Sequence, residues 1–495
     1  MSLQDHPKAY GAAALTVAFA TGVLVTLGLK DVYPDLERLY EDRRKQNQLR
    51  RAIRRADTIA SREEARRRGD SVGVRLEDHE SEVEPEGEGE GEDGWSLLDE
   101  SRLLDSRLLS RTRPAAGHSR SHGIAAGLAD CIGDTPLVRI GSLCAATGCE
   151  VLAKAELLNP GGSPKDRVAL SMIRTAEADG LLVPGRGDTI YEGTSGSTGI
   201  SIATLARALG YGAHIFMPDD QGVEKSRLLR EMGAVVERVP VAPIVDPGHF
   251  VNRARRAAAE HSQTHTDGSH GFFSDQFETP ANAEAHRRTT GPEIVQQVAS
   301  RNGSSRQSAF VCGAGTAGTL TGVARFLKED AGLGDWRIVA ADPQGSGLVN
   351  LVRNGVLYAA TEKEGTRRRS QVDSIVEGIG MNRMTATLEA GLHLIDDAVA
   401  VSDTQACHMA RWLVEHDGIF AGSSTAVNCV AAVAVALTLP PGSRVVTLLC
   451  DSGQRHLSKF YNVIDEMREA EGEGTEKAAG KDLLTILGLA PRSQK

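Results

Sequence analysis

Gly161-Gly162-Ser163-Pro164-Lys165-Asp166-Arg167 joins a glycine turn to an apolar helical pattern that begins at Val168. A lysine at such a junction can simply be the solvated start of a helix. Two further loops make Lys165 informative: Glu192-Gly193-Thr194-Ser195-Gly196-Ser197-Thr198-Gly199 follows strand-like residues 189–191, and Gly313-Ala314-Gly315-Thr316-Ala317-Gly318-Thr319 follows strand-like residues 309–312. We predict that both loops join a strand to a helix.

Strands and helices alternate along residues 123–465. The predicted strands are residues 150–154, 189–191, 214–217, 235–239, 310–311, 337–342 and 444–449, and the predicted helices include residues 200–208 and 225–232. This alternation is typical of parallel sheets covered by helices, and such folds bind ligands in the loops at the carboxyl ends of the strands. The sequence therefore predicts an α/β protein.

Composition narrows the class of function. The chain has 495 residues, of which 40% are hydrophobic, and a net charge of −10, which argues against nucleic-acid binding. The seven cysteines are scattered without Cys-x-x-Cys pairs, so we predict a reducing compartment, no structural metal and cysteines that act as small core residues. Residues 261–270 hold three histidines, which we interpret as a solvated loop rather than a metal site.

The N-terminal region differs from the rest of the chain. Within residues 1–32, the apolar run 12–29 predicts a single transmembrane helix, with a targeting sequence or a buried helix as alternatives. Arginines between residues 43 and 55 place the remainder in the cytosol by the positive-inside rule. Residues 33–68 predict a charged helical stalk, residues 69–122 a disordered acidic and basic linker, and residues 466–495 a C-terminal tail.

The two glycine-rich loops are candidate anion sites. A glycine-rich turn before a helix presents backbone N–H groups at the positive end of that helix. The turn at residues 315–319 suits a phosphate, and the turn at residues 193–199 could hold a carboxylate with the help of the hydroxyls of Thr194, Ser195 and Thr198. Neither turn is specific alone, because tight connections in Rossmann proteins are similar.

Together these segments resemble the fold-type II family of pyridoxal-phosphate enzymes, in the cysteine synthase and cystathionine β-synthase group. Further matching motifs are Gly133-Asp134-Thr135-Pro136-Leu137-Val138, Asp275-Gln276-Phe277, Pro280-Ala281-Asn282, Thr289-Thr290-Gly291-Pro292-Glu293-Ile294, Glu377-Gly378-Ile379-Gly380 and Asp451-Ser452-Gly453. The resemblance is strongest to membrane-anchored fungal members. It implies a tryptophan synthase β-like fold of two parallel-sheet subdomains, with a catalytic domain at residues 123–465 and a mobile subdomain at roughly residues 165–275.

The resemblance also implies roles for individual residues. Lys165 would form the Schiff base with pyridoxal 5′-phosphate and then move the substrate α-proton. The remaining expected cofactor contacts are Gly315, Thr316, Ala317, Gly318 and Thr319 for the phosphate, Ser452 for the pyridine nitrogen and Ser197 for the 3′-oxygen. The expected contacts of the substrate carboxylate are Thr194, Ser195 and Thr198 with Gln276, and Ser197 beside them.

The activity implied is O-acetylserine sulfhydrylase, in which sulfide replaces acetate through an aminoacrylate intermediate to give cysteine. Alternatives are cystathionine β-synthase, serine or threonine dehydratase, or a membrane-tethered binding or scaffold protein. Ser197 stands where relatives have asparagine and Ala317 where they have a second glycine, so altered activity is possible. We expect a homodimer at the mitochondrial outer membrane, with the endoplasmic reticulum as the alternative.

Overall fold

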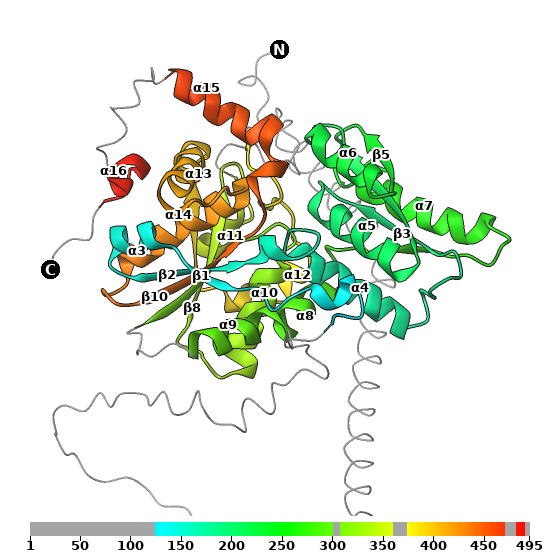
Figure 1. Cartoon of the computed structure of the whole chain (residues 1–495), viewed down its shortest axis with the longest axis horizontal. Helices are drawn as coiled ribbons and strands as arrows, with labels where there is room; N and C mark the ends of the chain where they lie inside the picture. The colour runs from blue at the N-terminus through cyan, green and yellow to red at the C-terminus, as the bar shows by residue number, and fades with distance from the viewer. Residues whose placement is uncertain (1–123, 300–306, 360–373, 471–481, 491–495) are drawn as a thin grey trace, which may run out of the picture. The chain divides into compact units, whose positions relative to one another are not determined.

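The structure is a computed structural model, and it describes residues 124–299, 307–359, 374–470 and 482–490. Within these ranges the strands form two sheets (Figure 1). The larger sheet has the order β1 (Leu137–Arg139), β2 (Glu150–Ala155), β10 (Arg444–Leu449), β7 (Ser308–Gly313), β8 (Arg337–Pro343) and β9 (Asp397–Val401). Its strands are parallel except β1, which is antiparallel to β2.

The smaller sheet has the order β5 (Val235–Val239), β4 (Gly212–Pro218), β3 (Thr189–Gly193) and β6 (Gly271–Phe273), and all its pairs are parallel. Figure 1 shows its strands in green together with α5, α6 and α7. The prediction of two parallel-sheet α/β units is thus confirmed, apart from the antiparallel edge strand β1.

Helices and short turns of helix connect the strands. The α-helices are α3 (Gly141–Thr147), α4 (Lys165–Ala178), α5 (Ser197–Leu209), α6 (Val223–Glu231), α7 (Phe250–Thr264), α8 (Pro280–Arg288), α9 (Thr290–Ala299), α10 (Gly318–Arg325), α11 (Leu348–Asn354), α12 (Ala386–Glu389), α13 (Asp403–Asp417), α14 (Ser423–Thr438), α15 (Asn462–Ala470) and α16 (Leu483–Leu487). The short turns are η2 (Leu128–Cys131), η3 (Glu156–Leu158), η4 (Phe326–Asp330), η5 (Leu392–Leu394), η6 (Gly453–Arg455) and η7 (Leu457–Tyr461).

Side chains alternate between the two faces of each sheet, as the pleat requires. In β7, Val311 packs into the core beside α14, whereas Phe310 packs into the core beside α10. In β3, Ile190 faces the core of α4 and α5, and Tyr191 faces α7. Strands that are buried on both faces explain the continuous apolar runs that identified them in the sequence.

Part of one segment differs from its prediction. Residues 261–264 are the last turn of α7 and not a solvated loop, because the imidazole of His261 is buried and hydrogen-bonds the hydroxyls of Tyr191 and Ser269, each at 2.9 Å. In the predicted tail, Leu483 and Leu487 of α16 are buried in the core that includes α13.

The predicted anchor at residues 12–29, the stalk at 33–68 and the linker at 69–122 lie outside the described residues. In the ranges that the structure does describe, no helix has both the length and the apolar character that crossing a membrane requires.

Candidate active site

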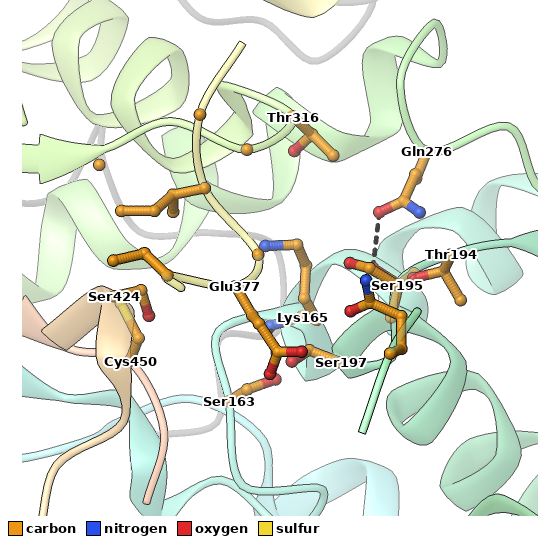
Figure 2. A pocket seen from close by; sticks show the side chains of 18 of the residues that line it. Ser163, Lys165, Thr194, Ser195, Ser197, Gln276, Thr316, Glu377, Ser424 and Cys450 are labelled. Carbon is orange, nitrogen blue, oxygen red and sulfur yellow. Dashed lines mark hydrogen bonds between the residues drawn. The ribbon is translucent and has the colours of Figure 1, made fainter. Parts of the chain in front are cut away.

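A cavity of about 780 Å³ opens where the loops of both sheets meet. Every predicted site residue except Ser452 lines it, namely Lys165, Thr194, Ser195, Ser197, Thr198, Gln276, Gly315, Thr316, Ala317, Gly318 and Thr319. Figure 2 shows Lys165 between the loop that carries Thr316 and the loop that carries Ser195 and Ser197. The fold therefore brings together residues that are more than 150 positions apart in the sequence.

Lys165 is the first residue of α4, and its side chain lines the cavity. Its amine forms no hydrogen bond with any residue in the described ranges. Burial lowers the pKa of this amine, and the nearby thiols of Cys450 and Cys312 and the carboxyl of Asp451 oppose that shift. A lysine in this setting is neutral at a lower pH than a solvated one, which suits a nucleophile or a base.

An ion-pair network fixes the start of α4 behind Lys165. The guanidinium of Arg167 lies 2.8 Å from Glu156 and 2.5 Å from Glu293, and Lys154 lies 2.5 Å from Glu293. Burial acts to raise the pKa of Glu156, but Arg167 outweighs it and holds this pKa at about 2. The network thus joins β2, η3, α4 and α9 through buried ion pairs, in which burial lowers the pKa of Lys154.

The loop from Gly315 to Thr319 connects β7 to α10 and is shaped by close contacts. A Cβ at Gly315 would overlap the carbonyl oxygen of Gly378, and a Cβ at Gly318 would overlap the side chain of Asn282. The backbone N–H groups of Gly315, Thr316 and Ala317 find no acceptor among the described residues. Free N–H groups beside the N-terminus of a helix form a cradle for an anion.

Side chains of α8 hold this loop in place, and sequence reasoning assigned them no role. Asn282 Nδ2 donates to Thr316 Oγ1 at 2.9 Å, and His286 Nε2 lies 3.1 Å from Thr319 Oγ1. Burial lowers the pKa of His286 to about 3, so the imidazole is neutral. The anion cradle is therefore supported by uncharged hydrogen bonds.

Ala317 adopts a left-handed conformation with φ of 64°. The replacement of glycine by alanine therefore has an energetic cost here, because a left-handed residue with a Cβ costs about 1 kcal/mol more than glycine. The loop keeps its shape despite this strain.

The second loop leaves β3 and enters α5. Thr198 Oγ1 donates to Gln276 Oε1 at 2.6 Å, and Gln276 Nε2 donates to the carbonyl oxygen of Gly193 at 3.2 Å. Gly196 has φ of 142°, and the stem of Lys225 from α6 lies over it. Gln276 thus ties together both ends of the loop that carries Thr194 and Ser195.

Ser452, predicted to face the pyridine nitrogen, does not line the cavity. The chain turns into η6 after β10, and Ser452 caps that turn by accepting a hydrogen bond from the N–H of Gln454 at 3.3 Å. Ser424 from α14 and Cys450 line the cavity instead. In the view of Figure 2 they lie on the opposite side of Lys165 from Gln276. The motif Asp451-Ser452-Gly453 alone could not show in which direction each side chain points after β10.

A buried charged cluster at the cavity wall also had no predicted role. Lys225 Nζ lies 2.6 Å from Glu377 Oε2, and His456 lies 3.5 Å from Glu377 and 3.0 Å from Asp451. Burial acts to raise the pKa of Glu377, but His456 and Lys225 lower it to about 2. Burial acts to lower the pKa of His456, but Asp451 and Glu377 raise it.

Comparison with known proteins corrects the predicted localisation. "Putative mitochondrial cysteine synthase" of Saccharomyces cerevisiae is 53% identical over 341 residues, which cover 69% of this chain and 85% of that protein. Its name refers to mitochondria and not to a membrane. With no membrane-spanning helix in the described ranges, the prediction of a single-pass protein of the mitochondrial outer membrane or endoplasmic reticulum is not upheld.

The other comparisons concern the whole catalytic region. Residues 128–451 match the family model described as "Pyridoxal-phosphate dependent enzyme". "Cysteine synthase 2" of Neurospora crassa is 56% identical over 491 residues, which cover 99% of each chain. The solved structure of an O-ureido-L-serine synthase superposes with a TM-score of 0.58 at 33% identity, covering 72% of this chain and 99% of that chain. Because its family match spans both loops and Lys165, the chain belongs to the pyridoxal-phosphate-dependent enzymes, among the cysteine synthases of fold type II.

Proposed function

We propose that this protein is a cysteine synthase that converts O-acetyl-L-serine and sulfide into L-cysteine and acetate. The bond from the substrate β-carbon to the acetate oxygen breaks, and a bond from that carbon to sulfur forms. The observation that supports this most strongly is the unpaired amine of Lys165, which faces the cavity shared by two anion-binding loops.

The residues of the cavity fit pyridoxal 5′-phosphate. The loop at residues 315–319 offers free N–H groups to a phosphate, and its glycines leave room that a Cβ would fill. Ser424 and Cys450 offer polar atoms to the ring, and Lys165 offers an amine to the aldehyde. When bound, this cofactor supplies an electron sink for the charge that develops at the substrate α-carbon.

Lys165 is the group that moves the substrate α-proton. Its lowered pKa favours the neutral amine, which can accept a proton, and the resulting ammonium returns that proton when the product forms. No other lysine that lines the cavity is available in this way, because Lys225 is paired with Glu377, and Lys459 lies 3.8 Å from the same carboxylate.

The loop of residues 194–198 orients the substrate. Hydroxyls of Thr194 and Ser195 and the backbone N–H groups before α5 can bind the α-carboxylate, while Gln276 holds Thr198 in position. Fixing the carboxylate and the α-amine sets the direction of the α-C–H bond relative to Lys165, which is the positioning contribution to the rate. Ser197 lines the same cavity and would contact the cofactor through its hydroxyl.

The test is to supply the purified, cofactor-loaded full chain with O-acetyl-L-serine and sulfide and to measure cysteine. Lys165→Ala should lower turnover by about 1,000-fold or more and should remove the visible absorption band that depends on a bond between the Lys165 amine and the cofactor aldehyde. Lys328→Ala is the matched control, because this lysine is paired with Asp396 and does not line the cavity, so it should keep normal turnover.

The rival reactions give different products. Pyruvate and ammonia without cysteine would indicate a dehydratase, and thioether formation only with homocysteine would indicate cystathionine β-synthase. A cofactor-loaded protein without any of these products would support a binding or scaffold protein. We also expect a homodimer, which light scattering on the purified protein measures.

A further inference from the structure

Glu192 is a buried carboxyl group directly behind the proposed substrate loop. It lies in β3, two residues before Thr194, and its side chain is completely buried. It does not line the cavity, and the proposed reaction assigns it no role. A fully buried glutamate at this place needs a reason, because burying an ionised carboxylate is costly unless it is paired.

The hydrogen bonds of Glu192 connect it to the residue that holds the loop. Ser274 Oγ donates to Glu192 Oε2 at 2.6 Å, and the backbone N–H of Gln276 donates to the same oxygen at 3.3 Å. Gln276 Nε2 donates to Glu192 Oε1 at 3.3 Å, while Gln276 Oε1 accepts from Thr198. The side chain of Gln276 therefore connects the carboxyl group of Glu192 to Thr198 in the loop.

No cation compensates the charge of Glu192 within the described residues. Glu156 and Glu377, the comparable buried glutamates, contact Arg167 and Lys225, and the pKa of each is held at about 2. Glu192 has only uncharged donors, and burial raises its pKa to about 7. Three glutamates of similar burial thus differ in charge state because of their partners.

None of the ionisable groups on the surrounding elements supplies the positive charge that Glu192 lacks. Asp275 follows β6 and acts to raise the pKa of Glu192 further. The other groups are engaged elsewhere or neutral. Arg255 on α7 pairs with Asp275, and burial lowers the pKa of His249, which caps α7, to about 4. His214 on β4 bonds Glu237, Asp166 on α4 accepts a hydrogen bond from Ser201, and Lys165 faces the cavity.

We propose that Glu192 is a positioning residue that carries a proton whenever the adjacent loop holds an α-carboxylate, so that binding of the amino-acid substrate takes up a proton at this site. The ligand class comes from the proposed function, on which this inference rests. A second negative charge beside an unpaired buried carboxylate would be unfavourable, whereas a neutral carboxyl group keeps the same hydrogen bonds.

The structure can accept this proton without movement of heavy atoms. Protonated Oε2 can donate to Ser274 Oγ, and the hydroxyl hydrogen of Ser274 can turn to the carbonyl oxygen of Tyr191, which lies 3.3 Å from Ser274 Oγ. Oε1 continues to accept from Gln276 Nε2. Every polar atom of the group remains paired in both states, as expected of a site that changes its charge.

The first experiment measures affinity against pH. L-alanine, which has the substrate's carboxylate and amine but no leaving group, is titrated into the holoenzyme by calorimetry. From about pH 6 to about pH 8.5 we expect the affinity of the wild type to fall about tenfold more than that of Glu192→Gln. Glutamine mimics the protonated group, so the variant should bind as tightly as the wild type at low pH and more tightly at high pH.

Glu284→Gln is the control, because this partly exposed partner of Arg288 on α8 does not line the cavity and should leave the wild-type pH profile unchanged. Equal pH profiles for the wild type and Glu192→Gln would overturn the proposal. A holoenzyme that does not bind L-alanine at any pH would also contradict it, because the ligand class would be wrong.

The second experiment needs no substitution and observes the proton directly. Infrared spectra of the wild type with carbon-13-labelled glutamate separate protonated glutamates from aspartates. Among described glutamates with a shifted pKa, only that of Glu192 is raised, so one labelled carboxyl band should titrate near pH 7 and move upward by about one pH unit with saturating L-alanine. A band that titrates below about pH 5, or that L-alanine does not move, refutes the inference.

The two experiments separate this inference from the proposed function. If the band moves with L-alanine while O-acetyl-L-serine and sulfide give no cysteine, Glu192 is still the linked group, and only the reaction is wrong. If cysteine forms normally and the band does not move, the reaction stands and Glu192 is merely structural.

Discussion

Lys225 Nζ and Glu377 Oε2 lie 2.6 Å apart, and their ion pair joins helix α6 beside the smaller sheet to the loop that packs against Gly315. Both side chains are almost fully buried, at 4% and 3% exposure. The stem of Lys225 also lies over Gly196, so this pair connects the loop at residues 193–199 with the loop at residues 315–319.

Breaking this pair should destabilise the protein strongly. We expect Lys225→Met to lower the free energy of unfolding by about 3 kcal/mol, because it removes one partner of a buried pair. Urea unfolding measures the change. The exposed pair of Arg288 and Glu284 provides the control, since Arg288→Met should change stability by less than about 1 kcal/mol. Equal losses of stability from the two substitutions would contradict the expected contribution of the buried Lys225–Glu377 pair.

The glycine cradle should not tolerate a methyl group at residue 315. Gly315→Ala places its Cβ on the carbonyl oxygen of Gly378, so the loop must shift. We expect a loss of about 1–3 kcal/mol in stability and weaker binding of pyridoxal phosphate, measured by unfolding and by absorption titration. Gly334→Ala has open space around its Cβ and should stay within about 0.5 kcal/mol of the wild type.

The two candidate serines near the cofactor ring can be separated by substitution. Ser424→Ala removes a hydroxyl that lines the cavity and should weaken binding of pyridoxal phosphate about fivefold, the effect of about one hydrogen bond. Ser452→Ala removes only the cap of η6 and should leave cofactor affinity unchanged. The reverse order of effects would restore Ser452 as the cofactor contact.

The cluster around His456 predicts a pH dependence of stability. Because its pKa is raised in the folded state, the protonated imidazole stabilises the fold below about pH 6.5, and this contribution is lost as the pH rises through the folded pKa. His456→Gln should therefore lose most stability relative to the wild type near pH 6, and the difference should shrink toward pH 9. Free energies of unfolding from urea titrations test this, with exposed His416→Gln as the control.

The contribution of Glu377, in the same cluster, to stability depends on pH in the opposite direction. Its pKa is lowered to about 2, so its contribution is present above about pH 4.5 and is lost as the pH falls toward 2. The cluster consequently stabilises the fold most between about pH 4.5 and about pH 6.5, where Glu377 is ionised and His456 is protonated.

Local patterns sufficed for the strands and for the loops that follow them. Residues 235–239 and 444–449 were predicted with the bounds that the structure gives, because both are rich in valine, a residue that favours strands. The three-residue strands β1 and β6 had no such signal, since their pairing is decided by neighbours distant in the sequence. Tertiary contact, rather than local preference, forms these edges.

The site residues also divide into those that a local pattern reveals and those that only the folded structure brings to the site. Lys165 and the two loops were visible because glycines and hydroxyl residues cluster within a few positions. Ser424 and Lys225 line the cavity from helices, and Asn282 hydrogen-bonds Thr316 from a third helix. Nothing local in the sequence distinguishes these three residues from core or surface residues. Ser452 lies outside the cavity lining, and its motif could not show this because a motif gives the order of residues and not the direction of each side chain.

The two anion-binding loops extend from different sheets, one from β7 and the other from β3. This arrangement makes the fold modular in an evolutionary sense. Substitutions around β3, α5 and α6 can retune which amino acid is accepted without altering the loop at residues 315–319 on the larger sheet. Related enzymes with new substrates are therefore expected to diverge first in the smaller sheet and its helices.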